Sequence, residues 1–283
     1  MSWEKNKLRI RNPQMREVLD RIFTGKDSIN VKFAVADAAP IIGVQSTVTI
    51  EASELAVMDV DDVIVFEGKT FTRKAATEAA DLEFEDAAGL ILCINHANGH
   101  DDVWTASDSG GDVLITRDVA GILGNDKTVM VDILEDTTSG GDGATTEATA
   151  SISADTIDEI ANGDIIRFAG YNFLKVASTP VAAKGEWDNV TSLVAAIDLL
   201  PEWDALVNTG AADITAASNA TAYNDYTINV YLYRVTENGV DGTVGEKGMV
   251  LMHGTSLYLA SDDIGTDNVT IGDWLVIDTT AHS

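Results

Sequence analysis

Two of the four histidines, His96 and His100, lie four residues apart in the 283-residue chain and are followed by two aspartates. On a helix this spacing places both rings on one side, where they could share a metal ion with a carboxylate. The dipeptide Asn98-Gly99 lies between them, and it favours a turn over a helix. The pattern therefore favours a polar loop over a metal site, and few residues are left for general-base catalysis.

Three groups of carboxylates are the other candidates for binding an ion, because calcium prefers several carboxylate and carbonyl oxygens. None of the groups has the spacing of an EF-hand loop, so a solvated acidic face is the favoured interpretation. The groups are Asp59, Asp61 and Asp62; Glu83, Glu85 and Asp86; and Asp262, Asp263 and Asp267.

The sequence lacks the short motifs of common active sites, such as a nucleophile elbow, a phosphate-binding loop, a dinucleotide fingerprint or a zinc-protease helix. Its single cysteine, Cys93, excludes an internal disulfide and leaves no paired thiols for zinc. We therefore expect no catalytic residue, no enzymatic activity and no cofactor, with calcium as the one ion left open.

Charge restricts the partners of the chain. Against 46 acidic side chains there are 18 basic ones, a formal net charge of −28, which repels nucleic acid and anionic membranes. The N-terminus has no apolar leader, and no apolar run is long enough to cross a membrane. We expect a soluble protein whose body binds neither nucleic acid nor membrane.

Residues 1–26 differ from the rest, because seven basic and three acidic side chains give them a net charge of +4 and leave −32 on the remainder. Asn12, Pro13 and Gly25 predict a short helix with one apolar face, which must dock on something to be stable. We expect this basic arm to bind an acidic neighbour; the alternatives are a frayed terminus and docking on its own body. The expected assembly contacts are Lys5, Lys7, Arg9, Arg11, Arg16 and Arg21, with Val18, Leu19, Ile22 and Phe23.

An internal repeat organises the rest of the chain, since residues 49–71 align without a gap with residues 151–173, 102 residues later. With small gaps the likeness continues to residues 133 and 232. The apolar positions that match are Ile50 with Ile152, Leu55 with Ile157, Met58 with Ile160, Ile64 with Ile166, Phe66 with Phe168, and Phe71 with Phe173.

Each copy reads as a strand, a hairpin, a helix and two further strands. The hairpin turns fall at Glu67-Gly68 and Ala169-Gly170, where glycine supplies the positive φ of a tight turn. Side chains alternate along the strands, so one face can bury against the helix. The predicted fold class is α+β, mostly β: two tandem β-sandwich-like modules with one helix each.

The predicted domains follow from this repeat. Residues 1–45 form the basic arm with its helix, and residues 46–136 and 149–235 are the two modules. Residues 137–148, rich in Gly, Ser and Thr, form a flexible linker between them. Residues 236–283 form a short C-terminal β unit that is too small to stand alone.

The hairpin and helix sequences carry a family resemblance. Asp62-Val63-Ile64-Val65-Phe66-Glu67-Gly68-Lys69-Thr70-Phe71-Thr72, followed by Ala87-Ala88-Gly89-Leu90-Ile91-Leu92-Cys93-Ile94-Asn95 and two strands, resembles a module widespread in tailed-bacteriophage virion proteins. The segment His253-Gly254-Thr255-Ser256-Leu257-Tyr258-Leu259 with Gly272-Asp273-Trp274 resembles the β unit that closes many phage fibre and head-surface proteins. Neither resemblance brings an active-site motif.

The resemblance implies a structural component of a virion, either a head decoration or head fibre or a tail protein, made in the host cytoplasm. Its partners would be copies of itself and capsid or tail subunits. Two alternatives stay open: a carbohydrate- or receptor-binding adhesin, and a calcium-stabilised extracellular surface array. Trp203, after the Pro201-Glu202 departure from the first copy, and Tyr258 are the candidate ligand or partner contacts. The same sugar-stacking role is left open for Tyr223, Tyr226, Tyr231 and Tyr233.

Overall fold

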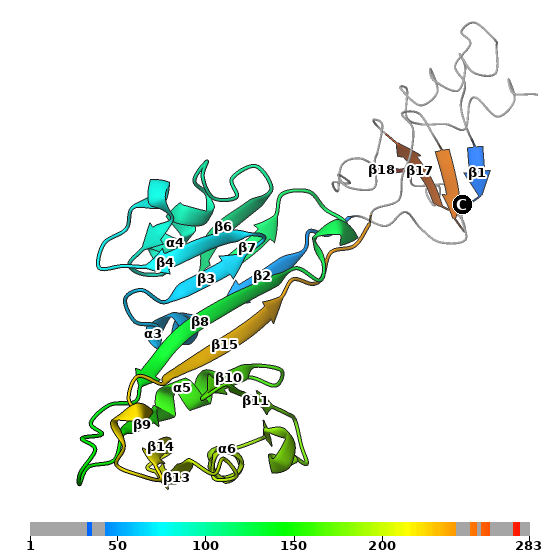
Figure 1. Cartoon of the computed structure of the whole chain (residues 1–283). Helices are drawn as coiled ribbons and strands as arrows, with labels where there is room; N and C mark the ends of the chain where they lie inside the picture. The colour runs from blue at the N-terminus through cyan, green and yellow to red at the C-terminus, as the bar shows by residue number, and fades with distance from the viewer. Residues whose placement is uncertain (1–32, 36–42, 242–249, 254–255, 261–273, 278–283) are drawn as a thin grey trace, which may run out of the picture. The chain divides into compact units, whose positions relative to one another are not determined.

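The computed structural model describes residues 33–35, 43–241, 250–253, 256–260 and 274–277 (Figure 1). The chain divides into two compact units. One consists of residues 45–239 and contains both copies of the repeat. The other combines residues 1–44 with residues 240–283.

Both copies have the same order of elements, which confirms the mostly β, α+β fold class. Copy 1 contains β2 (Thr47–Ile50), α3 (Ala52–Ala56), β3 (Val63–Phe66), β4 (Lys69–Arg73), β5 (Glu83–Phe84), α4 (Ala87–Ile94), β6 (Trp104–Ser109), β7 (Asp112–Arg117) and β8 (Thr128–Thr137). Copy 2 contains β9 (Thr149–Ile152), α5 (Ala154–Glu159), β10 (Ile165–Phe168), β11 (Tyr171–Lys175), β12 (Glu186–Trp187), α6 (Val190–Ile197), β13 (Trp203–Asn208), β14 (Ala211–Ala216) and β15 (Thr227–Val235). We call residues at equivalent positions counterparts.

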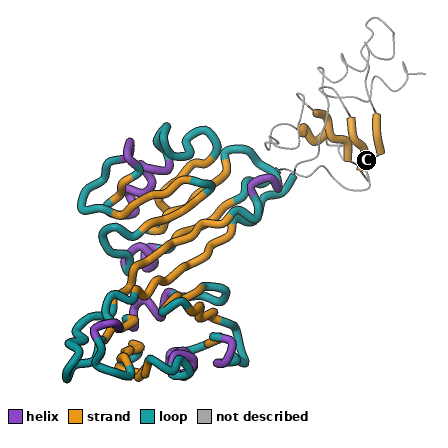
Figure 2. The backbone as a smooth tube through the Cα atoms, viewed as in Figure 1, coloured by secondary structure: helices purple, strands orange, loops and turns teal. Residues whose placement is uncertain are grey.

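The two copies share one sheet. Its eight strands lie in the order β12-β11-β10-β15-β8-β3-β4-β5, with the long strands β8 and β15 antiparallel at its centre (Figures 1 and 2). Each copy adds a three-stranded sheet, β2-β7-β6 or β13-β14-β9. Apolar side chains of all three sheets and of α4 and α6 form one continuous core. The modules are therefore two halves of a single body.

The arrangement has a local twofold axis. Asp132 pairs with Val63 in copy 1, and its counterpart Tyr231 pairs with Ile165 in copy 2. Asp132 and Tyr231 also pair with each other across β8 and β15. Counterparts that face each other lie on the axis that exchanges the copies.

The residues that follow β8 and β15 each form hydrogen bonds with the other copy. The Thr138 hydroxyl, after β8, donates to the carbonyl of Tyr223 at 2.6 Å and accepts from the amide of Tyr226 at 2.9 Å, both in copy 2. Thr236, after β15, makes the matching contacts with Gly124 and Lys127 in copy 1. Both threonines are buried, so each copy is completed by the strand end of the other.

Residues 137–148, predicted to be a flexible linker, are held by specific contacts. Asp142 accepts hydrogen bonds from three successive amides, at Ala144, Thr145 and Thr146, and these bonds hold the pKa of its carboxyl well below its usual range. Gly141 exchanges two bonds of 2.9 Å with the Asn224 amide of copy 2. Composition alone does not reveal these side-chain acceptors.

Both hairpin turns have the expected glycine. Gly68 and Gly170 adopt φ values of +78° and +82°, and the residues before them, Glu67 and Ala169, are also in the left-handed region at +44° and +49°. Two successive residues of positive φ define a type I′ turn, whose twist matches that of the paired strands. No atom lies near the position of a Cβ on either glycine, so conformation rather than space requires glycine here.

The second unit contains a four-stranded sheet. β1 (Phe33–Val35) runs parallel to β16 (Val250–His253), which continues antiparallel to β17 (Ser256–Ala260) and β18 (Trp274–Ile277). The predicted helix of the basic arm and all its proposed contacts lie outside the described residues. In the part of the chain that the structure describes, no helix is long and apolar enough to cross a membrane.

Candidate functional site

One face of the eight-stranded sheet is buried, and the side chains of the other remain partly or fully exposed. Ile64, Phe66 and Phe71 point into the core in copy 1, as the alternating pattern predicted. The residues between them, Val63 and Val65, lie on the open face and remain partly accessible. The same alternation holds in copy 2, so the open face extends across both copies.

Apolar and aromatic side chains occupy much of this open face. It carries Val63, Val65, Met130 and Leu134 from copy 1 and the β8 strand, and Ile165, Leu174, Tyr231 and Tyr233 from copy 2. None of them is buried, and Leu134 is 45% exposed. A solvent-facing sheet surface is usually polar, so this apolar composition is unusual for an exposed face.

Acidic groups lie among these apolar side chains. Glu83 and Glu186 occupy counterpart positions at the two edges, and Asp132 lies on the central axis. Burial raises the pKa of the Asp132 carboxyl, and a hydrogen bond from the Asn229 side chain partly offsets that effect. The open face therefore carries carboxyl groups beside its apolar side chains, and Asp132 among them lies partly buried.

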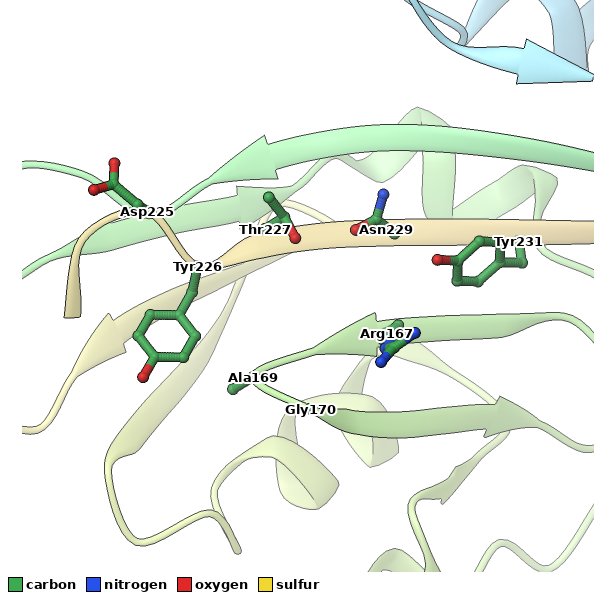
Figure 3. Close-up of a pocket in the computed structure, with 8 residues that line it drawn as sticks. All are labelled: Arg167, Ala169, Gly170, Asp225, Tyr226, Thr227, Asn229 and Tyr231. Carbon is green, nitrogen blue, oxygen red and sulfur yellow. The ribbon is translucent and has the colours of Figure 1, made fainter. Parts of the chain in front are cut away.

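A hollow of about 360 Å³ lies on the copy 2 part of this face (Figure 3). Arg167 and Asn229 form a cross-strand pair at its floor, next to the ring of Tyr231. Tyr226 and the β10–β11 turn border its other end. The full lining is Arg167, Ala169, Gly170, Asp225, Tyr226, Thr227, Asn229 and Tyr231.

The counterparts in copy 1 have different chemistry. Val65 and Met130 replace Arg167 and Asn229 as the cross-strand pair. Where copy 2 has Tyr226 and Ala169, copy 1 has Lys127 and Glu67, whose charged groups lie 3.7 Å apart. The apolar core positions match, whereas these positions on the open face differ in chemistry.

The two histidines of the sequence pattern do not come together. His100 is 7% exposed, and its Nε2 lies 3.0 Å from the carbonyl oxygen of Phe66. His96 accepts the amide of Asn98 through Nδ1. The loop is as predicted, but one of its histidines belongs to the core; among the described residues no cluster of three or more potential ligands is placed to hold a metal ion.

Some of the acidic groups have structural roles instead of forming a solvated face. Asp62 is buried and accepts the amides of Asp59 at 2.6 Å and Leu134 at 2.8 Å, while its burial raises the pKa of the carboxyl. Asp86 caps α4 by accepting the Gly89 amide. The third group, around Asp263, lies outside the described residues.

Trp203, predicted to contact a ligand or partner, lies in the core at 3% exposure. Its ring packs edge-to-face on Phe168 at 4.7 Å, as its counterpart Trp104 packs on Phe66 at 5.0 Å. A buried ring cannot stack on a sugar, so the prediction is wrong for this residue. The loop before it is shorter in copy 2, which hid the correspondence in the sequence. The side chain of Tyr258, on β17, is outside the described part.

Of the tyrosines left open by the sequence, Tyr226 and Tyr231 line the hollow. Arg167 was missed, although its alignment with Val65 is a visible break in a matched apolar pattern. Comparison with protein-family models, with curated proteins and with solved structures found no match for the chain.

Proposed function

We propose that the chain is a structural component of a tailed-phage virion that acts by homo-oligomeric assembly and by attachment to neighbouring virion proteins. The observation that carries the assembly role is the open face of the eight-stranded sheet, with its exposed apolar side chains. The virion assignment is supported by the resemblance of the hairpin and helix sequences.

The occupant that we propose for the copy 1 part of the open face is the basic arm of a neighbouring copy. Residues 1–26 carry a net charge of +4, and their predicted helix has an apolar side. This part of the face presents apolar side chains beside Asp132 and Glu83. Apolar contact would provide binding energy, and opposite charge would orient the arm.

The test compares full-length protein with three variants by light scattering coupled to size-exclusion chromatography, over a range of concentrations. Deletion of residues 1–26 and the double change Val65→Lys with Leu134→Lys are both expected to shift oligomer to monomer. Val60→Lys is the matched control, because Val60 is 57% exposed outside the sheet. A monomeric wild type at every concentration would refute self-assembly, and an oligomer unaffected by the deletion would refute the role of the arm.

The virion role has a separate test. The chain should be present in purified phage particles by mass spectrometry, and particles made with the arm deleted should lack it. Absence from wild-type particles would reject the virion assignment and leave the self-assembly result standing.

A further inference from the structure

We propose that the hollow in copy 2 binds an acidic saccharide, with Arg167 recognising its carboxylate. This site is additional to the assembly role, and it is assigned by the contrast between the two copies. Copy 1 shows the same fold without these side chains.

Arg167 is the first element of the site. Its side chain is exposed on the open face, and it has neither an ion pair nor a hydrogen bond with any described residue. The only acidic residue among the lining side chains, Asp225, lies at the far end of the hollow in Figure 3. A guanidinium in this state can bind a carboxylate through two parallel hydrogen bonds.

The tyrosines supply the second element. Tyr226 borders the hollow, and its ring is held by an edge-to-face contact with the core residue Trp203 at 5.4 Å. Tyr231 lies beside Arg167 on the neighbouring strand. Aromatic rings pack on the apolar faces of sugar rings while their hydroxyls bond to sugar hydroxyls.

Polar groups around the rim complete the match to a saccharide. Asp225 and Thr227 are exposed at the end of the hollow opposite Arg167, where they can bond to sugar hydroxyls. A volume of about 360 Å³ is within the range of small-ligand sites. A guanidinium at one end, with Asp225 and Thr227 as acceptors for sugar hydroxyls at the other, fits a uronic acid better than a neutral sugar or a simple carboxylate.

Copy 1 cannot bind the same ligand at the equivalent place. Val65 and Met130, in place of Arg167 and Asn229, offer no side-chain hydrogen bonds to a ligand. The lysine at the position of Tyr226 is paired with Glu67. The site is therefore single in each chain.

The experiment titrates full-length protein with D-glucuronic acid, D-glucose and acetate, followed by isothermal calorimetry and ligand-observed NMR. Glucuronate is expected to bind at least about tenfold more tightly than either of the other two. Glucose lacks the carboxylate that would bind Arg167, and acetate lacks the sugar ring that would contact the tyrosines. Arg167→Val and Tyr231→Asp, which install the copy 1 residues, should each weaken binding by about tenfold or more. Arg167→Lys should retain part of the affinity, because it keeps the charge and loses the paired geometry.

Val60→Ala, at an exposed position of copy 1 outside the sheet, is the control and should bind as the wild type does. Equal binding of glucose would refute the carboxylate recognition, and no glucuronate binding or an unaffected Arg167→Val variant would refute the site. Oligomeric state is measured on the same samples, so loss of the saccharide site is distinguishable from failure of assembly.

Discussion

Glu54 of copy 1 and Arg234 of copy 2 form an ion pair that joins the two copies inside the body. The Glu54 side chain is 1% exposed, and the same guanidinium lies 3.2 Å from Asp164. At the counterpart positions Thr156 donates to Glu135 at 2.6 Å, so the opposite side of the axis uses a hydrogen bond. The axis relates the backbones more closely than the side chains.

Glu54→Ala should lower the free energy of unfolding by about 3 kcal/mol, because it leaves a mostly buried arginine with one acidic partner in place of two. Urea denaturation measures the change. The control is Lys127→Ala, which breaks an exposed pair and should change stability by less than about 1 kcal/mol. A loss below that of the control would contradict a structural role for the buried pair.

Stability should rise on mild acidification from about pH 7. Burial raises the pKa values of the Glu54, Asp62 and Asp132 carboxyls above their unfolded values, so the folded state binds protons more tightly. Such groups contribute stability that is fully present at low pH and is lost as pH rises through the folded pKa. The lowered pKa of Asp142 acts oppositely, and its contribution is lost only in strong acid.

Thermal melts at a series of pH values test this trend, with Asp132→Asn as the comparison variant. Asparagine cannot titrate, so the variant should show a smaller increase on acidification. A melting temperature that falls steadily from neutral pH to about pH 5 would show that burial does not raise the pKa values of these carboxyls.

The rate at which the Cys93 thiol is labelled should report local unfolding of copy 1. The thiol is fully buried, and burial raises its pKa to about 11, so it should react with a thiol reagent only when the structure opens. Asn224→Ala, in copy 2, removes two bonds to the linker and should speed this labelling about fivefold if the copies open together. Asn172→Ala, at an exposed position, is the control. Unchanged labelling in Asn224→Ala would mean that the copies open independently.

Gly68→Ala should destabilise the protein by about 1 kcal/mol, because alanine at φ +78° is strained while no neighbouring atom obstructs its methyl group. Glu67→Asn should act in the opposite direction, since asparagine tolerates positive φ better than glutamate. Urea denaturation of both variants distinguishes backbone strain from crowding. A neutral Gly68→Ala would argue against the type I′ geometry.

The sequence was sufficient to predict the repeat, the hairpins with their glycine turns and the buried faces, because these depend on local periodicity. It did not predict that β8 pairs with β15, because alternating apolar and polar residues predict a strand but do not indicate which other strand it pairs with. The short helices α3 and α5 were also missed, because five or six residues carry too little periodicity to distinguish a helical turn from a loop.

The candidate site was only partly predictable. Tyr226 and Tyr231 stood out as aromatics, but Trp203 stood out equally and is a core residue. Whether an aromatic ring is accessible depends on how the three-stranded sheet of copy 2 packs on the eight-stranded sheet. Arg167 could have been found by treating each mismatch between the repeats as a marker, as its pairing with Asn229 in the structure now shows.

The facing counterparts Asp132 and Tyr231 also bear on how the protein arose. In an ancestor with a single repeat, the same residue of two separate chains would have met at this point, as in a symmetric dimer. With both copies in one chain, the two sides of the axis need not carry the same residue. Arg167 and Asn229 in copy 2 therefore stand where copy 1 has Val65 and Met130, a difference that identical subunits cannot have.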